Sequence, residues 1–501
     1  AGTSLVPGVA DASAVQLEGL RQLSNAMILN VDTYATANGV TPLPRANVAL
    51  VWSFKTQTIG KTLAAIQVAS KNPLDPYAAK LADFKVTASL PAANFAAVAK
   101  LPTAAYANIA TVVQGTVAMP YYLDVYSTAN PLGPLTGRFQ VDAYGMPTVK
   151  TIQTIPFFMT IPNAPKLGGG GSWPVVIFQH GFTVDKNAMF GIANTLAKAG
   201  FATIAIDSVL HGSRTFKLDL VTESKDSYGN VSVTANVADG YADSSGRHYL
   251  NLSYLLTTRD NARQSVADLI HLTRLLEVQT MDVVNNITGL APGGDGADLD
   301  TAANSISFVG HSNGGILGTM FASVDPYVKT IVLANAGAGY GDIFQNSIEV
   351  SPLINAGLEA KGITVGSADY LAFMNAAQTV GDDSDPINYG ITYNNWIATN
   401  AKKVFVLKTT PDKVVPNSAT NTLISILGPL TQVGIAAANS PLLGSSGYVN
   451  YISGTHSTFL RPAGVTNPTE FLAAYTQMQK ATVNFLAGSG VTVIAGSTVV
   501  E

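Results

Sequence analysis

Apolar residues along this chain gather into short unbroken runs that stop abruptly at glycine or at a polar residue. The run at 306–309 stops at the pentad Gly310–Gly314, which reads G-H-S-N-G, and a small-residue apolar segment follows at 315–322. Unbroken runs of this length are typical of strands that are buried on both faces of a parallel sheet. Small residues after the pentad favour a helix packed closely against that sheet. The pattern therefore predicts a strand, a sharp turn and a helix in succession.

Similar apolar runs recur in the second two-thirds of the chain and alternate with segments of helical periodicity. We expect strands at 173–178, 201–206, 330–336, 403–409 and 448–453, and helices at 187–199, 257–278 and 469–486. Strands that alternate with helices indicate crossover units, which produce parallel pairing. The sequence therefore predicts an α/β protein with a mostly parallel, doubly wound sheet.

Two regions differ from this alternation. Residues 1–150 carry their own helix and strand patterns but no candidate catalytic constellation, so we expect an N-terminal accessory or cap domain before a catalytic domain at 151–501. Residues 337–400 are too long for an ordinary connection between two strands. Their apolar residues, which include Phe373 and Met374, predict a lid insertion over the substrate. The alternative is a satellite core that only closes the domain.

Three residues that follow expected strands could act together as a catalytic triad. Ser312 is the centre of the pentad, Asp412 follows the strand at 403–409, and His456 follows the strand at 448–453. A serine hydroxyl becomes nucleophilic beside an imidazole base, and a carboxylate must fix the tautomer of that base. The chain order Ser, Asp, His is that of the catalytic triad in α/β hydrolases. The strand–turn–helix setting of G-x-S-x-G is that of their nucleophile elbow. Because parallel strands end at one edge of a sheet, we expect the three side chains to meet there.

The choice of base and acid depends on position in the chain. Among the six histidines, only His456 follows both the serine and a plausible acid; the others are His180, His211, His248, His271 and His311. Asp385 and Asp369 also lie between Ser312 and His456, but both belong to the expected lid rather than to the end of a strand. This difference favours Asp412.

The oxyanion hole is expected to use backbone N–H groups next to the elbow. The segment Q-H-G-F at 179–182 follows an apolar strand, and its glycine allows the chain to turn so that the N–H of Phe182 faces the site. The N–H of Asn313, directly after the serine, is the second expected donor. The residues expected to line the substrate-binding site are His180, Gly181, His311, Phe373 and Met374.

Composition narrows the function classes. Hydrophobic residues make up 47% of the chain and charged residues 12%, the net charge is −4, and cysteine is absent. The absence of cysteine excludes disulfides and a thiol nucleophile, and the small negative charge predicts no binding of nucleic acid. Asp295, Asp298 and Asp300 lack the spacing of an EF-hand loop, so no metal is predicted. We expect no cofactor and no transmembrane span.

Several segments resemble bacterial extracellular lipases and lysophospholipases of the virulence-factor type. The resemblance rests on G-H-S-N-G-G-I at the elbow, on Q-H-G-F, on residues 209–213 and 255–269, and on W-S-F-K-T-Q-T and P-Y-Y-L near the N-terminus. It implies the α/β-hydrolase fold and carries the Ser, Asp and His roles onto Ser312, Asp412 and His456. Asn313 departs from the family, which usually has leucine there, and part of the family's amino-terminal region is lacking.

The resulting expectation is a serine carboxylic ester hydrolase, a lipase or esterase that acts through an acyl-enzyme. A polyester depolymerase, a short-chain esterase and, less favoured, a peptidase would use the same triad, whereas an adhesion or lipid-binding protein on this fold would have lost it.

The expected partner is an ester of a small molecule, a lipid or a polyester, with transient contact to a lipid surface. The resemblance and the start at Ala1 predict a secreted or outer-membrane protein whose signal peptide has been removed. The oligomeric state is left open.

Overall fold

The computed structural model describes most of the chain as two compact units, residues 1–58 and 59–501. The described residues are 4, 7–48, 51, 53, 56–80, 83–164, 172–215, 222–225, 231–234, 246–277, 298–302, 305–390, 402–434, 446–462, 468–488 and 497–501. Asp295 therefore lies outside the described residues. Among these residues, no helix has the length and apolar character that crossing a membrane requires.

The larger unit is built on one mixed sheet. Within the described residues it has eleven strands, ordered β1-β2-β3-β5-β4-β9-β10-β11-β13-β12, with β8 beside β4. The strands are β1 (Phe84–Pro91), β2 (Ile109–Tyr121), β3 (Thr151–Pro162), β4 (Trp173–Gln179), β5 (Ala202–Ile206), β8 (Leu299–Asp300), β9 (Ile306–His311), β10 (Thr330–Ala334), β11 (Lys403–Thr409), β12 (Thr431–Gln432) and β13 (Gly447–Tyr451). A separate hairpin pairs β6 (Thr222–Lys225) with β7 (Val231–Thr234).

The strands from β5 to β12 pair in parallel, and β1, β2 and β3 pair antiparallel at the other side of the sheet. The carboxyl ends of β9, β10, β11 and β13 therefore lie along a single edge. This parallel sheet with its antiparallel flank, together with the turn after β9, is the α/β-hydrolase fold, which confirms the predicted fold class.

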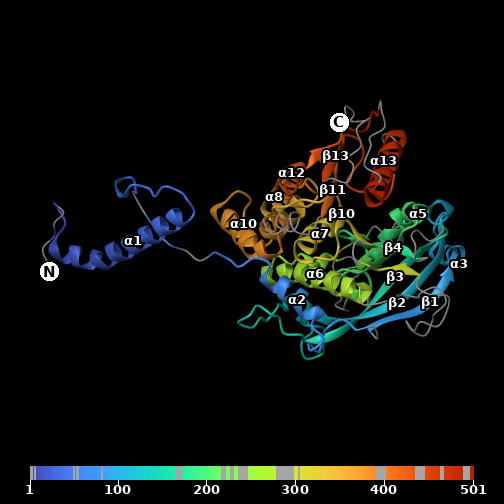
Figure 1. The fold of residues 1–501 in the computed structure, drawn as a ribbon, viewed down its shortest axis with the longest axis horizontal. Coiled ribbons are helices and arrows are strands. Elements are labelled where there is room, and N and C mark those ends of the chain that lie inside the picture. The colour runs from blue at the N-terminus through green and yellow to red at the C-terminus, as the bar shows by residue number, and fades with distance from the viewer. Residues whose placement is uncertain are drawn as a thin grey trace. The chain divides into compact units, whose positions relative to one another are not determined.

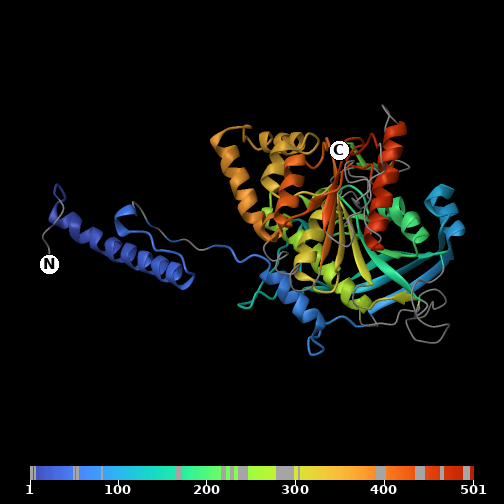
Figure 2. The same cartoon turned by 45° about the horizontal axis from the view of Figure 1, so that its top comes forward.

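Helices cover both faces of the sheet in this unit (Figures 1 and 2). The helices are α2 (Lys61–Lys71), α3 (Ala92–Ala99), α4 (Gly133–Thr136), α5 (Phe190–Lys198), α6 (Leu255–Glu277), α7 (Asn313–Val324), α8 (Tyr340–Asn346), α9 (Ser351–Glu359), α10 (Ala368–Gly381), α12 (Asn417–Ile426) and α13 (Pro468–Leu486). One hydrophobic core joins one sheet face to α2, α6, α7 and α12, and the other joins the opposite face to α3, α5 and α13.

Alternate residues of each central strand supply these two cores. In β9, Phe308 belongs to the core beneath α6 and α7, whereas its neighbour Val309 belongs to the core beneath α5 and α13. Successive side chains of a strand point to opposite faces, so a strand between two helical layers must be apolar throughout. This explains why the central strands read as unbroken apolar runs, and it fixes the sheet edge at which the candidate site lies.

The predicted domain boundary near residue 150 is wrong. The chain divides instead between Thr58 and Ile59. Residues 59–150 belong to the larger unit because β2 pairs with β3 along almost its whole length, from Ile109 to Tyr121, and β1 pairs with β2. The smaller unit contains α1 (Asp11–Ala37). An accessory role for residues 1–58 stays a prediction.

The predicted lid region begins after β10 and contains α8, α9 and α10. Its last residues, 391–400, lie outside the described part of the chain. Ile354, Leu358, Tyr370 and Met374 are buried in the core that also holds α6 and α7. The segment is therefore anchored to the body of the larger unit through its own apolar face, and a role as a lid stays a prediction.

Candidate active site

Ser312 lies in a strained turn between β9 and α7. Its backbone dihedrals are φ 57° and ψ −124°, a combination that residues other than glycine rarely adopt. Residues strained in this way occur most often at functional sites. The turn is held from both sides, because Ser312 N–H donates to Ala334 O at 2.8 Å and the Ser312 carbonyl accepts from Gly315 N–H at 2.9 Å. The neighbouring sheet and helix thus impose the strained geometry that the elbow motif predicts.

Gly181 packs directly against the serine. A Cβ atom at this position would lie 2.8 Å from Ser312 Cβ and 3.2 Å from Ser312 Oγ, so any larger residue would displace the hydroxyl-bearing side chain. Ser312 is 6% exposed. The turn after β4 and the turn after β9 therefore form one compact structure.

Asp412 and His456 are joined by a hydrogen bond at the same edge of the sheet. His456 Nδ1 lies 2.7 Å from Asp412 Oδ2, and the other carboxylate oxygen accepts from the N–H groups of Val414 and Val415 at 2.8 and 3.0 Å. Asp412 is 6% exposed. A buried carboxylate held in this way can orient an imidazole and stabilise its protonated form.

His311 connects this pair to the elbow. Its Nε2 lies 2.8 Å from the carbonyl oxygen of His456, and the two imidazole rings have centroids 5.1 Å apart. Because His311 directly precedes Ser312, the base is placed next to the elbow. Within the described residues no hydrogen bond joins Ser312 Oγ to His456, a contact that in free enzymes often tightens only when substrate binds.

Asp385 has a different surrounding from Asp412. It accepts from Gly339 N–H at 2.9 Å, Tyr340 N–H at 2.6 Å and Gln378 Nε2 at 3.0 Å. These bonds fix the start of α8 and tie it to α10. The structure therefore gives Asp385 a scaffold role in the segment after β10 and brings Asp412 to His456. Asp369 lies in the first turn of α10.

The predicted oxyanion donors lie on the two turns that meet at Ser312. Asn313 is the first residue of α7, whose first-turn N–H groups have no acceptor within the helix. Phe182 follows Gly181 and packs edge-on against Tyr249, with ring centroids 5.2 Å apart. Their role in stabilising an oxyanion stays a prediction.

The predicted substrate-binding residues are not all in one place. His180 is buried, and both ring nitrogens bond to main-chain groups, Nε2 accepting from Ser208 N–H at 3.0 Å and Nδ1 lying 2.8 Å from Gly181 O. It therefore shapes the turn. Met374 is buried in the core beneath α10, and Phe373 is half-buried against that core. Substrate contact by Phe373 and Met374 stays a prediction.

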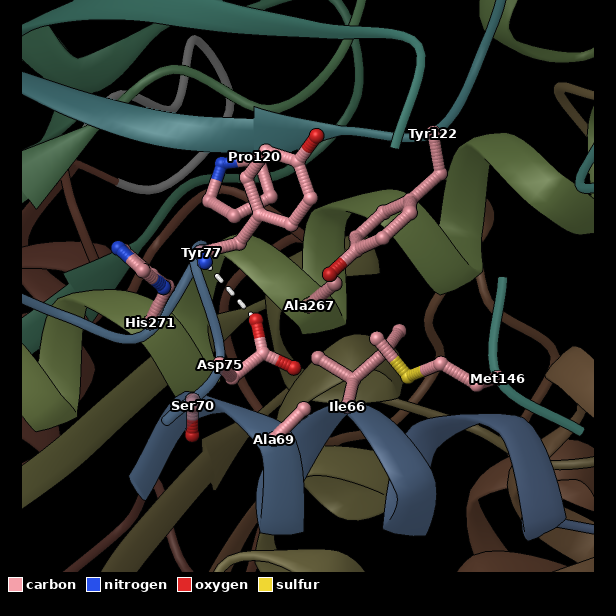
Figure 3. Close-up of a pocket in the computed structure, with 10 residues that line it drawn as sticks. All are labelled: Ile66, Ala69, Ser70, Asp75, Tyr77, Pro120, Tyr122, Met146, Ala267 and His271. Atoms are coloured by element: carbon pink, nitrogen blue, oxygen red, sulfur yellow. Dashed lines mark hydrogen bonds between the residues drawn. The ribbon is translucent and has the colours of Figure 1, made fainter. Parts of the chain in front are cut away.

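A small cavity lies away from these residues, between α2, α6 and the end of β2 (Figure 3). Its volume of about 10 Å³ is enough for about one water molecule. His271 of α6 lines it, and its Nε2 is buried without a hydrogen-bond partner. Neither Ser312 nor His456 lines this cavity, so it is separate from the candidate site.

Buried histidines predict that the protein loses stability in acid. Burial lowers the pKa of His211 and His311 to about 3 and that of His271 to about 4. In the unfolded chain these groups titrate near their ordinary value of about 6.5. The unfolded state therefore binds more protons between about pH 6.5 and pH 3, so stability is complete above this window and falls as the pH falls through it.

Thermal unfolding at a series of pH values checks this expectation. The Tm should fall progressively below about pH 6.5. His271→Leu removes one of the three buried rings, the one beside the separate cavity, and should make the fall shallower. A wild-type Tm that stays constant down to pH 4, or an identical fall in the variant, would show that the buried rings do not control acid stability.

The comparisons with known proteins give only distant structural likenesses. No protein-family model matches the sequence, and no curated protein does so either. Among solved structures, an acetyl xylan esterase from Paenibacillus sp. R4 is 13% identical over 87% of this chain and 99% of its own, with a TM-score of 0.43. A putative dienelactone hydrolase from Klebsiella pneumoniae subsp. pneumoniae MGH 78578 is 14% identical over 67% and 93%, with a TM-score of 0.37.

A third solved structure, acetyl xylan esterase 1 from Thermoanaerobacterium sp. JW/SL YS485, is 13% identical over 73% of this chain and 87% of its own, with a TM-score of 0.38. All three likenesses are distant. The class of the chain, an α/β-hydrolase fold with a serine elbow after β9, follows from its own strand order and backbone geometry.

Proposed function

We propose that this chain is a serine hydrolase of carboxylic esters. The observation that carries the proposal is the Asp412–His456 hydrogen bond of 2.7 Å at the sheet edge where Ser312 occupies its strained turn. A strained backbone turn costs stability, and so does a buried carboxylate–imidazole pair. Their meeting at the carboxyl ends of β9, β11 and β13 supports a shared catalytic purpose.

The proposed reaction has two halves. Ser312 Oγ attacks the ester carbonyl carbon while His456 Nε2 takes the hydroxyl proton, and the tetrahedral intermediate expels the alcohol, which receives that proton. Water then attacks the acyl carbon while His456 takes a proton from it, and the second tetrahedral intermediate releases the carboxylic acid as His456 returns the proton to Ser312 Oγ. Asp412 holds the Nδ1 proton of His456 throughout and stabilises the imidazolium formed in each half.

The negative charge on the intermediate's oxygen needs preorganised donors. We infer that the N–H groups of Asn313 and Phe182 supply them, because the turns that carry these residues meet at the contact between Gly181 and Ser312. The loss of one such donor in other enzymes costs about 3–4 kcal/mol of transition-state stabilisation.

Within the ester hydrolases, we propose a lipase or lysophospholipase of the bacterial extracellular type, acting on lipid esters outside the cell. The sequence motifs at 179–182 and 310–316 and the low charge of the chain support this class. The test is a panel of nitrophenyl esters of increasing acyl length, a lysophospholipid and an aliphatic polyester. Preference for the polyester or for acetate would instead indicate a depolymerase or a short-chain esterase. No hydrolysis of any member would favour a non-catalytic lipid-binding protein.

Phe373 offers a test of the proposed lid. If α10 lines the acyl pocket, Phe373→Ser should change the ranking of acyl lengths and leave acetate hydrolysis nearly unchanged, because a short acyl group would not reach it. Rates on the nitrophenyl ester series measure this. Met374→Ala, at a position that is 3% exposed, should cost about 2–5 kcal/mol of stability, and it shows what a loss of core packing alone does to the Tm. If Phe373→Ser only lowers the Tm and the ranking stays fixed, the segment is a structural core.

A further inference from the structure

The loop that carries His456 is anchored by its own main chain. The carbonyl oxygen of His456 accepts two hydrogen bonds, one from Asn335 Nδ2 at 2.7 Å and one from His311 Nε2 at 2.8 Å. A carbonyl oxygen has two lone pairs, so both are used. Because a carbonyl can only accept, the amide of Asn335 must present its nitrogen to His456, and His311 must carry its proton on Nε2.

Asn335 occupies a position that is costly to maintain. It directly follows β10, it is 1% exposed, and its φ of 50° lies in the left-handed region. Its N–H donates to Leu407 O of β11 at 2.9 Å, and its Oδ1 accepts from Thr409 Oγ1 at 3.0 Å. The hydroxyl of Thr409 therefore fixes the orientation of the amide, and the ends of β10 and β11 together hold its nitrogen toward His456.

His311 can serve beside the base without opposing its positive charge. Burial, together with the neighbouring His456, lowers the pKa of His311 to about 3, so its ring stays neutral when the base becomes an imidazolium. The Nδ1 atom of His311 is buried without a hydrogen-bond partner, so no contact of Nδ1 opposes the neutral form that carries its proton on Nε2. The two donors to the His456 carbonyl differ in their other neighbours. His311 directly precedes Ser312, whereas Asn335 contacts the base through the main-chain carbonyl of His456.

We propose that Asn335 is a positioning residue, fixed by Thr409, that sets the place of the His456 imidazole relative to Ser312 through the His456 carbonyl. The proposal rests on the proposed function, since it assigns a part in the same proton transfer. Displacement of a base by about 1 Å can cost about 100-fold in rate. The hydrogen bond to Asp412 fixes only one end of the imidazole, and the backbone of its loop must be fixed as well.

The decisive variant is Asn335→Gly, because glycine keeps the left-handed backbone without strain and removes only the amide. At a temperature well below the Tm, kcat on a nitrophenyl ester should fall about 10–100-fold while KM stays within about twofold. Thr409→Val, which removes the hydroxyl that orients the amide, should lower kcat by a smaller factor. Asn72→Gly, at the exposed C-terminal end of α2, is the control for the loss of an asparagine side chain and should keep wild-type kcat.

A second readout does not depend on turnover. The proton between His456 Nδ1 and Asp412 should give a downfield imidazole resonance in the NMR spectrum, and Asn335→Gly should shift or broaden it while Asn72→Gly leaves it unchanged. Unchanged kcat and an unchanged resonance in folded Asn335→Gly would overturn the positioning role, as would a loss confined to KM. If wild-type protein hydrolyses no ester but the resonance responds to Asn335→Gly, the positioning stands and the proposed function fails.

Discussion

Ser312→Ala is expected to abolish ester hydrolysis, with residual activity at the level of a trace. The alanine side chain fits the space beside Gly181 and β10, and the backbone contacts of the turn do not involve the hydroxyl, so folding should be unchanged. In serine hydrolases the loss of the nucleophile lowers kcat by about 10⁶-fold. The measurement is the steady-state rate of purified variant on a nitrophenyl ester, with circular dichroism as the check on folding.

Ser425→Ala is the matched control for this experiment. Ser425 is exposed on α12, and its hydroxyl donates only to Thr422 O of its own helix. It should keep the wild-type rate. Ester hydrolysis by folded Ser312→Ala at more than a trace would mean that another group attacks the ester.

Asp412→Asn is expected to lower kcat by about 10⁴-fold, because an amide cannot keep the imidazole in the tautomer that the reaction needs. Asp385→Asn forms the matched comparison. Its carboxylate accepts from the N–H groups of Gly339 and Tyr340 at the start of α8 and from that of Ile387. In the variant an amide N–H would face one of these N–H groups, so the change should lower stability and leave kcat nearly unchanged.

Rates and thermal unfolding of the two aspartate variants, measured side by side, separate the roles. The expected pattern is a large loss of kcat with a near-normal Tm for Asp412→Asn, and the reverse for Asp385→Asn. If Asp385→Asn is the slower enzyme, the acid belongs to the segment after β10 and the site has to be assigned differently.

Much of the larger unit could be predicted because its elements are encoded locally. The apolar run at 403–409 is β11 with the predicted bounds, and the helical periodicity at 469–486 is α13, which begins one residue earlier than predicted. The elbow could also be predicted from the sequence, because its glycines are required by contacts within a few residues or with one neighbouring turn. These features depend on side chains close in sequence, and hydrophobic periodicity reports them directly.

The features that could not be predicted depend on contacts between distant parts of the chain. The boundary at 150 was wrong because the pairing of β2 with β3 is not visible in either strand alone. Asn335 was missed because its partner, His456, is 121 residues away. The one local signal was a polar residue directly after the buried strand β10, and that signal does not reveal what the side chain reaches.

The central claim, that Ser312 is the nucleophile of this site, is tested most directly by trapping it. The protein is incubated with a nitrophenyl alkylphosphonate, which phosphonylates activated serines, and the adduct is located by peptide mass spectrometry. We predict one adduct per chain, on the peptide that contains Ser312, no adduct in Ser312→Ala, and a much slower reaction in Asp412→Asn. A protein that stays unmodified, or whose adduct lies on another residue, would contradict the assignment.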